Sequence, residues 1–422
     1  MAEWRNWSGS VVARPAWVAR PRDEAELCAL VARAERVRVA GTGHSFMPLC
    51  ETEGLLLSLA DMDGDLEVDL DRASVWAPAG LSIGALTSAL WKKGFSLANQ
   101  GDIDKQAIAG ALSTATHGTG RTLGALSTFA RAFRLVLADG SVVECDAERD
   151  PDLFEAQRVS LGALGVMSRV KLSVLPVYRL RETLRRVRLD EALEQWDELA
   201  QRCRHVEFFV FPYADHALLK ILEPVESGDD DPPASELEAA AIQFASDIAH
   251  RAPFLAPTLQ RLLTLGMTPS TRAAPAHRIF PSERDTRFEE MEYEIPAANG
   301  PGALRSVIAE VRRRKLPIIF PLEYRVVAGD DLWLSPMNAG ECVSISFHKY
   351  AKMPLRDAFA AIEPIFAAAG GRPHWAKRHT LTSEDVVRLY PMAERWGRVR
   401  KRVDPGAKFL NAHLRALFAF SL

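Results

Sequence analysis

The feature that most constrains the fold is a stretch with hardly any long side chain, Ala109–Gly120, which reads Ala-Gly-Ala-Leu-Ser-Thr-Ala-Thr-His-Gly-Thr-Gly. A second glycine-bearing loop, Gly41-Thr-Gly-His-Ser45, directly follows a strand-like run at Val37–Ala40. Small residues let backbone N–H groups come close to a diphosphate, because no side chain stands in the way. The two loops therefore indicate a phosphate site, although each loop alone is also typical of an ordinary turn.

Short strands and helices alternate around these loops. Asp23 can cap a helix in which apolar residues recur at i, i+3, i+4 and i+7. A second helix is expected at 82–93, and strands at 133–137 and 170–175, so residues up to about 178 form one α+β unit. Further strands are expected at 316–327 and 342–350, with a helix near 356–369. Since 422 residues exceed one ordinary core, we expect two large domains.

Other cofactor signatures are incomplete or missing. Gly41-x-Gly43 is followed by Phe46, where a Rossmann loop needs its third glycine. A Rossmann unit also needs a helix between this loop and the acidic residue, here Asp61, and Pro48 and Gly54 disfavour such a helix. The chain also contains no GxxxxGK phosphate loop and no HExxH metal motif.

Composition limits the classes of partner and the compartment that we expect for this chain. Lys and Arg are spread along a chain of formal net charge -3, which disfavours nucleic-acid binding. No apolar run approaches the roughly 18 residues of a membrane span, and no signal peptide is recognisable. The cysteines have no CxxC spacing, so we expect neither disulfides nor a metal site, and we expect a cytoplasmic protein; they are Cys28, Cys50, Cys145, Cys203 and Cys342.

Five segments resemble one protein family. Gly41–Ser45 is similar to the loop of vanillyl-alcohol-oxidase-type flavoproteins whose histidine is bonded covalently to the flavin. Ala115–Gly120 resembles their second pyrophosphate loop, and Ser160–Val166 the segment near the adenine. Gly371–Lys377 and Asp404–Asn411 resemble the C-terminal motifs of the members that oxidise L-gulono-1,4-lactone, D-arabinono-1,4-lactone or alditols. The similarity extends over about 10–178 and 320–420.

The resemblance implies a fold and a cofactor. It implies a two-lobed FAD-binding domain of the vanillyl-alcohol-oxidase (PCMH) type at 1–178, with 401–422 packing back on it, and an α+β cap domain at 179–400. It implies FAD attached through His44. The FAD-binding residues would be Val39, Ala40, Gly41, Thr42, Gly43, His44, Ser45, Gly101, Asp102, Gly110, Ser113, Thr114, His117, Val166 and Lys377.

Three of these residues need comment. Gly101 matches a family position over the reactive edge of the flavin, where a missing Cβ leaves room for dioxygen; a turn glycine is the alternative. Asp102 departs from the family pattern, because alditol-oxidising members have a serine there. His117 is interpreted as supporting its loop by hydrogen bonding.

Four residues are the candidates for catalysis. Glu323 and Arg325 are two apart in a strand-like run, so both can project into one pocket and bind substrate hydroxyls, although a surface ion pair is the alternative. Alditol-oxidising members have their active-site histidine at the place of Ser346, which suggests that His348 has taken over the role of base. Lys377 matches a lysine beside the flavin; either His348 or Lys377 would take the hydroxyl proton.

The function implied is FAD-dependent oxidation of a sugar-1,4-lactone of the L-gulono-1,4-lactone type at the carbinol next to the carbonyl. Hydride would go to flavin N5, and electrons to O2 or another acceptor. Three alternatives stay open: an alditol (xylitol or sorbitol) oxidase, a nicotinamide-dependent reductase with the same FAD domain, and a non-catalytic flavin- or sugar-binding protein.

Overall fold

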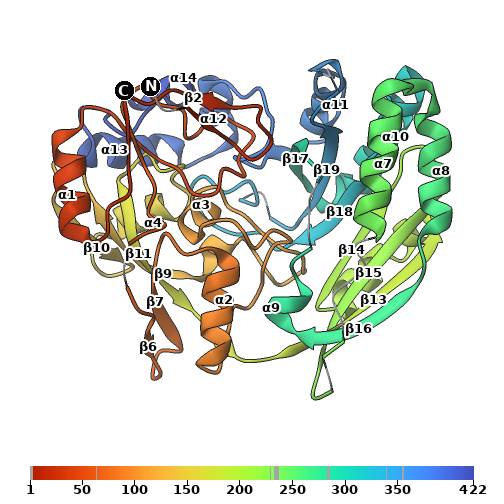
Figure 1. Cartoon of the computed structure of the whole chain (residues 1–422), viewed down its shortest axis with the longest axis horizontal. Helices are drawn as coiled ribbons and strands as arrows, with labels where there is room; N and C mark the ends of the chain where they lie inside the picture. Colours follow the sequence, from red (N-terminus) through yellow and green to blue (C-terminus); the bar gives the residue numbers. More distant parts are fainter. Residues whose placement is uncertain are drawn as a thin grey trace.

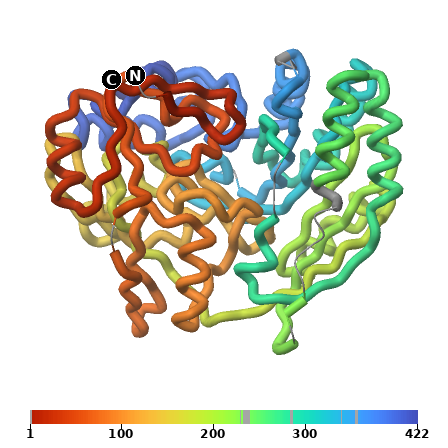
Figure 2. The backbone as a smooth tube through the Cα atoms, in the orientation of Figure 1, coloured from red at the N-terminus to blue at the C-terminus, as the bar shows by residue number. Residues whose placement is uncertain are grey.

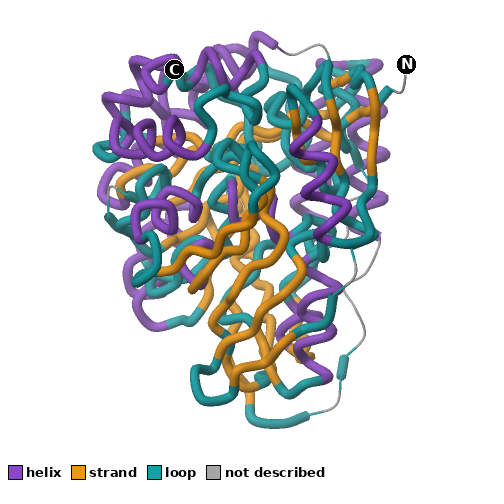
Figure 3. The backbone as a smooth tube through the Cα atoms, turned by 90° about the vertical axis from the view of Figure 1, so that its left-hand side faces the viewer, coloured by secondary structure: helices purple, strands orange, loops and turns teal. Residues whose placement is uncertain are grey.

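The computed structural model describes residues 3–422 apart from 63, 229, 232–236, 283–285, 339 and 354–355. Two groups of elements lie side by side in Figure 1, each with its own sheets and its own large apolar core. Seen from the side, strands run through the middle of the molecule and helices lie around them (Figure 3). This mixture of helices and mostly antiparallel sheets confirms the expected α+β class.

A small parallel sheet positions the loop at 41–45. Its strands are ordered β3 (Trp17–Ala19), β5 (Leu55–Leu57) and β4 (Val37–Val39), and helix α1 (Glu24–Arg33) connects β3 to β4. Asp23 caps α1 as expected, because its carboxylate accepts a hydrogen bond from the Glu26 N–H. The glycine loop leaves the carboxyl end of β4.

A five-stranded antiparallel sheet forms the rest of the first group. Its order is β10 (Val142–Asp146), β9 (Ala130–Val136), β11 (Val166–Ser173), β7 (Ser74–Pro78) and β6 (Glu67–Asp69). The same apolar core includes residues of helices α2 (Ile83–Lys92), α3 (Ile108–Ser113) and α4 (Pro151–Arg158). The second glycine-rich stretch therefore consists of the short helix α3 and the loop that follows it.

The second group is built on an eight-stranded sheet whose neighbouring strands are antiparallel. Its order is β16 (Ser270–Pro275), β13 (Arg179–Arg188), β15 (His216–Val225), β14 (His205–Val210), β18 (Leu322–Val327), β19 (Cys342–Tyr350), β17 (Phe288–Pro296) and β20 (Arg372–Pro373). Helices α7 (Leu237–Arg251), α8 (Ala256–Gly266) and α10 (Gly300–Arg314) stand near one another beside it (Figure 1).

Alternation along the central strands separates the two faces of this sheet. One face carries apolar residues such as Phe208, Tyr324 and Ile345, which share a core with α5 (Leu189–Glu194), α6 (Trp196–Arg202), α10 and α11 (Arg356–Ala368). The other face carries buried charged residues on β13, β14, β15, β17, β18 and β19. Because both faces are buried, the charged residues must pair with one another.

The C-terminal part of the chain returns to the first group. Helices α12 (Ser383–Leu389), α13 (Ala393–Val403) and α14 (Ala412–Leu417) add residues to its core, and Trp375 lies there too. Figure 2 shows the C-terminal end beside the N-terminal end. The packing thus extends the returning segment towards residue 375, beyond the predicted 401–422, and the domain division at 178/179 stays a proposal.

One local expectation was wrong. The strand expected at 316–327 begins only at Leu322, because Pro317 and Pro321 lack the N–H groups that a ladder requires. The Pro-His-Trp-Ala-Lys segment is a turn closed by a hydrogen bond from the Lys377 N–H to the His374 carbonyl. Within the described residues, no helix combines the length and the apolar character needed to cross a membrane.

Candidate active site

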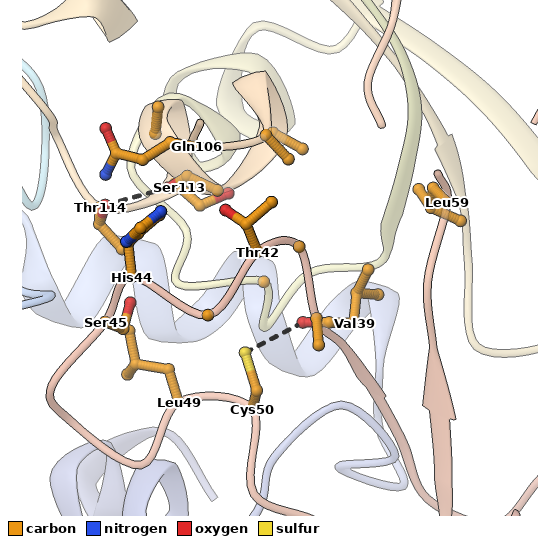
Figure 4. A pocket seen from close by; sticks show the side chains of 18 of the residues that line it. Val39, Thr42, His44, Ser45, Leu49, Cys50, Leu59, Gln106, Ser113 and Thr114 are labelled. Carbon is orange, nitrogen blue, oxygen red and sulfur yellow. Dashed lines mark hydrogen bonds between the residues drawn. The ribbon is translucent and has the colours of Figure 1, made fainter. Parts of the chain in front are cut away.

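A pocket with about 1290 Å³ of space between protein atoms, part of it open to solvent, lies between the loop at 41–45 and α3 (Figure 4). In Figure 4 the side chains of Thr42 and His44 lie on the same side as Ser113 and Thr114, and Leu59 lies across the pocket. Ten of the predicted FAD-binding residues line it: Val39, Ala40, Gly41, Thr42, Gly43, His44, Ser45, Gly110, Ser113 and Thr114.

Glycines shape the walls of this pocket. A Cβ on Gly41 would come within 2.9 Å of the Ala107 Cβ, and one on Gly80 within 2.1 Å of the Leu59 carbonyl oxygen. Gly43 has a φ of +77°, which favours glycine. The loop and the helix can therefore approach only because side chains are missing, and their backbone groups border the pocket.

Arg38 ties three segments together at the floor of the pocket. Its guanidinium donates hydrogen bonds to the carbonyl oxygens of Leu49 at 2.7 Å, Leu161 at 2.8 Å, Gly162 at 2.9 Å and Phe409 at 2.5 Å. These bonds satisfy a fully buried cation without a carboxylate partner. The sequence motifs at 160–166 and 404–411 are thus held against β4 by one side chain.

His44 lies at the edge of the pocket, with its ring centroid 5.6 Å from that of Trp7. Burial lowers the pKa of His44 to about 4, and the nearby charge of Lys377 acts in the same direction. The ring is therefore neutral at pH 7 and keeps an electron pair on nitrogen. A neutral imidazole is the form that can bond to carbon.

Charged and hydroxyl side chains form a continuous row across the second sheet. Strand register places one member directly opposite the next, in the order Lys220, Glu207, Arg325, Ser344 and Glu294. A parallel row contains Glu323, Ser346 and Glu292, and His348 lies opposite Glu290. All ten side chains are buried, so the rows form one polar layer inside the protein.

Arg325 is the centre of this layer. Its Nε lies 2.6 Å from Glu207 Oε2, and its Nη2 lies 2.5 Å from both Glu323 Oε2 and Asp102 Oδ2. Burial opposes the charge of the guanidinium, but the carboxylates of Asp102, Glu323 and Glu207 outweigh burial and raise the pKa of Arg325. The predicted pair Glu323–Arg325 is therefore buried, and the surface-pair interpretation is wrong.

His348 and Lys377 share one carboxylate partner. His348 Nε2 lies 3.5 Å from Glu290 Oε1 and 3.9 Å from Glu323 Oε1, while its Nδ1 lies 3.3 Å from the Pro321 carbonyl oxygen. Lys377 forms an ion pair with Glu290 and lies 3.5 Å from Glu292 Oε2. Burial opposes the lysine charge, but Glu290 and Glu292 outweigh it and raise the pKa of Lys377.

His117 connects the second glycine-rich stretch to the charged layer. Its Nε2 lies 3.1 Å from Glu292 Oε1 and 3.3 Å from Glu294 Oε1, and its Nδ1 lies 2.8 Å from the Gly118 carbonyl oxygen. Burial disfavours the charged ring, but Glu294 and Glu292 outweigh burial and raise the pKa of His117 to about 10.

The same three side chains have the spacing of a metal-ligand set, since their ligand atoms lie within 4.8 Å of one another. The two glutamates favour the protonated form of the ring, and we interpret His117, Glu292 and Glu294 as an ion-pair cluster.

The remaining predicted residues lie outside the pocket lining. Gly101 is buried, and a Cβ there would lie 3.0 Å from the His117 carbonyl oxygen, which is a tight contact. Val166 packs in an apolar core, while its neighbours Gly165 and Met167 line the pocket. Asp102 contacts Arg325, which places it on the sheet side of the site.

Contacts between aromatic rings connect the pocket to the charged layer. Trp7 contacts His44, and its ring centroid lies 5.2 Å from that of Phe288, which in turn lies 4.9 Å from that of His348. Lys377 Nζ lies 5.5 Å from the centroid of Phe46, whose N–H donates to the Ala376 carbonyl. The candidate FAD-binding and catalytic residues thus belong to one continuous region.

Several residues of this region were not predicted from the sequence: Arg38, Glu207, Lys220, Glu290, Glu292 and Glu294. The three glutamates of β17 carry a usable signal, because Phe-Glu-Glu-Met-Glu-Tyr-Glu-Ile places glutamate at alternate positions opposite apolar ones.

Comparison with known proteins gives a consistent result along the whole chain. Residues 170–417 match the D-arabinono-1,4-lactone oxidase family, and residues 15–146 match the FAD binding domain family. The chain is 40% identical to L-gulono-1,4-lactone dehydrogenase of Mycobacterium tuberculosis over 98% of both chains. It is 29% identical to L-gulonolactone oxidase of Bos taurus, over 99% of this chain and 98% of that one.

Solved structures show the same fold. The cholesterol oxidase of Brevibacterium sterolicum has a TM-score of 0.83 at 15% identity, over 99% of this chain and 96% of that one. A solvent-stable cholesterol oxidase has a TM-score of 0.82 at 16% identity, over 100% and 97%. The expected FAD-binding domain of the PCMH type, with a cap, is confirmed as the fold class.

Proposed function

The chain belongs to the D-arabinono-1,4-lactone oxidase family and is an FAD-dependent oxidoreductase acting on sugar lactones; we propose L-gulono-1,4-lactone as its substrate, oxidised at the carbinol next to the carbonyl. The observation that carries this proposal is the buried layer in which Glu323, Arg325, His348 and Lys377 converge beside the pocket that contains His44. A sugar presents several hydroxyls, and such a layer offers both acceptors and donors for them.

The pocket between loop 41–45 and α3 fits FAD. Its walls depend on glycines at 41, 43 and 80, and the hydroxyls of Thr42, Ser113 and Thr114 lie on residues that line it. Small residues and backbone groups of this kind suit a diphosphate. When bound, FAD supplies the acceptor for the two electrons that the carbinol loses.

We propose that His44 holds the flavin covalently. The support is that the neutral ring lies at the edge of the pocket beside the Trp7 ring, and that the Trp7 backbone N–H donates to the Gly43 carbonyl at 2.8 Å. Acid-precipitated protein should therefore stay yellow, and His44→Ala should release the colour into the supernatant. A white wild-type precipitate would leave the FAD assignment standing and remove the covalent bond.

Glu323 and Arg325 are proposed to bind the substrate hydroxyls, with His348 as the base. The Pro321 carbonyl can only accept, so it favours the tautomer with hydrogen on Nδ1 and leaves Nε2 as the proton acceptor. Nε2 faces Glu290 and Glu323, where a substrate hydroxyl would lie. Lys377, already protonated through its ion pairs, would stabilise negative charge that develops on the carbinol oxygen.

Turnover with a substrate panel tests the proposal. We expect L-gulono-, L-galactono- and D-arabinono-1,4-lactone to be oxidised, with xylitol, sorbitol and NADPH inactive. Oxygen consumption compared with dye reduction would identify O2 or another compound as the electron acceptor. Activity on alditols alone would favour the alditol oxidase alternative, and no activity on any sugar would favour a binding protein.

The five cysteines are free, which supports a reducing compartment, and we propose the cytoplasm.

A further inference from the structure

The guanidinium of Arg325 is held by carboxylates from both halves of the molecule. Glu207 and Glu323 lie on neighbouring strands of the eight-stranded sheet, whereas Asp102 reaches Arg325 from the loop between β8 (Phe95–Ser96) and α3. The side chains of Arg325 and Asp102 are only 10% and 16% exposed. An arginine in this position would ordinarily be a binding group for a substrate carboxylate.

Carboxyl groups also outnumber cationic groups around Arg325, although burial and the neighbouring Glu292 raise the pKa of Glu294 and so favour its neutral form. Lys220 Nζ lies 3.0 Å from Glu207 Oε1 and 3.7 Å from Glu182 Oε2, and Arg272 Nε lies 2.7 Å from Glu182 Oε1. In the layer connected by these contacts, seven carboxyl groups face five cationic groups and one further histidine, His348, which lies between Glu290 and Glu323. The carboxyl groups are Asp102, Glu182, Glu207, Glu290, Glu292, Glu294 and Glu323, and the cationic groups are Lys220, Arg272, Arg325, Lys377 and His117.

The proposed substrate has a charged relative from which it must be distinguished. A 1,4-lactone hydrolyses to an open-chain acid that keeps the hydroxyls of the lactone, gains one at C4 and, at neutral pH, carries a carboxylate. The hydroxyls alone cannot separate the two compounds, because the site can hydrogen-bond both. Charge can separate them, since an anion entering a buried layer rich in carboxylates is strongly repelled.

We propose that Asp102 is a specificity-determining residue that admits the neutral lactone and excludes the ring-opened acid. The third carboxylate on Arg325 contacts Nη2 and balances positive charge that the acid would otherwise use. Arg325 then binds substrate hydroxyls from a fixed position, with its charge balanced by the neighbouring carboxylates. This inference rests on the proposed lactone oxidation and assigns its substrate class more narrowly.

Inhibition of the purified holoenzyme by L-gulonate, with L-gulono-1,4-lactone as substrate, tests the inference. The variant Asp102→Asn keeps the size of the side chain and an oxygen for Arg325, but removes the charge. We expect the ratio of the L-gulonate Ki to the lactone KM to fall by about tenfold or more in this variant. A general loss of packing would change kcat or melting temperature and would leave this ratio where it was.

Glu182→Gln is the matched control, because it removes a carboxylate of the same layer that contacts Lys220 and Arg272. We expect its ratio to change by less than about threefold, since the charge it removes is farther from Arg325. An unchanged ratio in Asp102→Asn, or an equal fall in Glu182→Gln, would overturn the inference. If the wild-type enzyme does not oxidise lactones at all, the proposed function fails first, so the two failures are distinguishable.

Discussion

His117 Nε2 lies 3.1 Å from Glu292 Oε1 although 175 positions separate the two residues in the chain. The contact joins the loop after α3 to strand β17, so it connects the pocket lined by α3 to the charged layer of the sheet. Glu294 Oε1 lies 3.3 Å from the same nitrogen. The predicted role of His117 as a loop support is thus extended to a link between the two groups of elements.

This link makes stability depend on pH. The pKa of His117 is raised to about 10 by Glu294 and Glu292 despite burial, against about 6.5 for an unfolded histidine. The ion pairs of protonated His117 therefore add on the order of a few kcal/mol to the free energy of unfolding. This stabilisation is fully present below about pH 6.5 and is lost as the pH rises towards 10. We expect denaturation midpoints of wild type and His117→Gln to converge between pH 6.5 and 10. If the difference between the two denaturation midpoints stayed constant with pH, this role of His117 would be contradicted.

Removing the proposed base should slow chemistry. His348→Asn loses the Nε2 acceptor, and we expect the rate of flavin reduction by lactone to fall by about 100-fold or more. His205→Asn is the matched control: His205 is equally buried on the same sheet, but its Nδ1 contacts the Thr119 carbonyl oxygen at 2.7 Å, away from Glu290. Stopped-flow absorbance measures both, and undiminished reduction in His348→Asn would remove His348 from the mechanism.

Lys377 should matter for stability as well as for rate. Lys377→Met leaves Glu290 and Glu292 buried without their shared cation, which costs about 3–5 kcal/mol of unfolding free energy. Lys377→Arg keeps the charge and should recover most of that loss. Denaturant titration measures the difference; equal stability of the Met and Arg variants would show that the ion pairs contribute little.

The pocket assignment can be tested apart from catalysis. A Cβ on Gly110 meets no protein atom within 4 Å, and Gly110 lines the pocket, so Gly110→Leu should fold normally and bind less FAD. Gly302→Ala, in α10, also meets nothing within 4 Å and should raise stability by about 0.5–1 kcal/mol with full flavin content. Equal flavin-to-protein ratios in the two variants would move FAD elsewhere.

Much of the fold and of the FAD pocket could be predicted from the sequence, because their signals are local. The glycine-rich loop after β4 shows its role in a few residues and lines the pocket together with residues of 109–114, most of which form helix α3. The segment Ala115–Gly120, expected as the second pyrophosphate loop, lies outside the pocket lining. The strand with Cys342–Tyr350 was likewise placed correctly, since its alternation is continuous. The start of β18 was misplaced because apolar residues around Pro317 and Pro321 imitate a strand that cannot pair there.

The charged layer could not be predicted in the same way. Its partners come together through the register of five strands and the position of one loop, as in the contact of Asp102 with Arg325 across 223 positions. Glutamates at alternate positions of β17 would ordinarily indicate a strand with one solvated face. Only the structure shows that this face is covered and that Glu290, Glu292 and Glu294 are buried.

The central claim is that this chain oxidises a sugar lactone with its flavin. The most direct measurement is the absorbance of the anaerobic holoenzyme when L-gulono-1,4-lactone is added. We predict that the flavin band is bleached by lactones and not by xylitol, sorbitol or NADPH. A band that stays unchanged with every lactone would contradict the account.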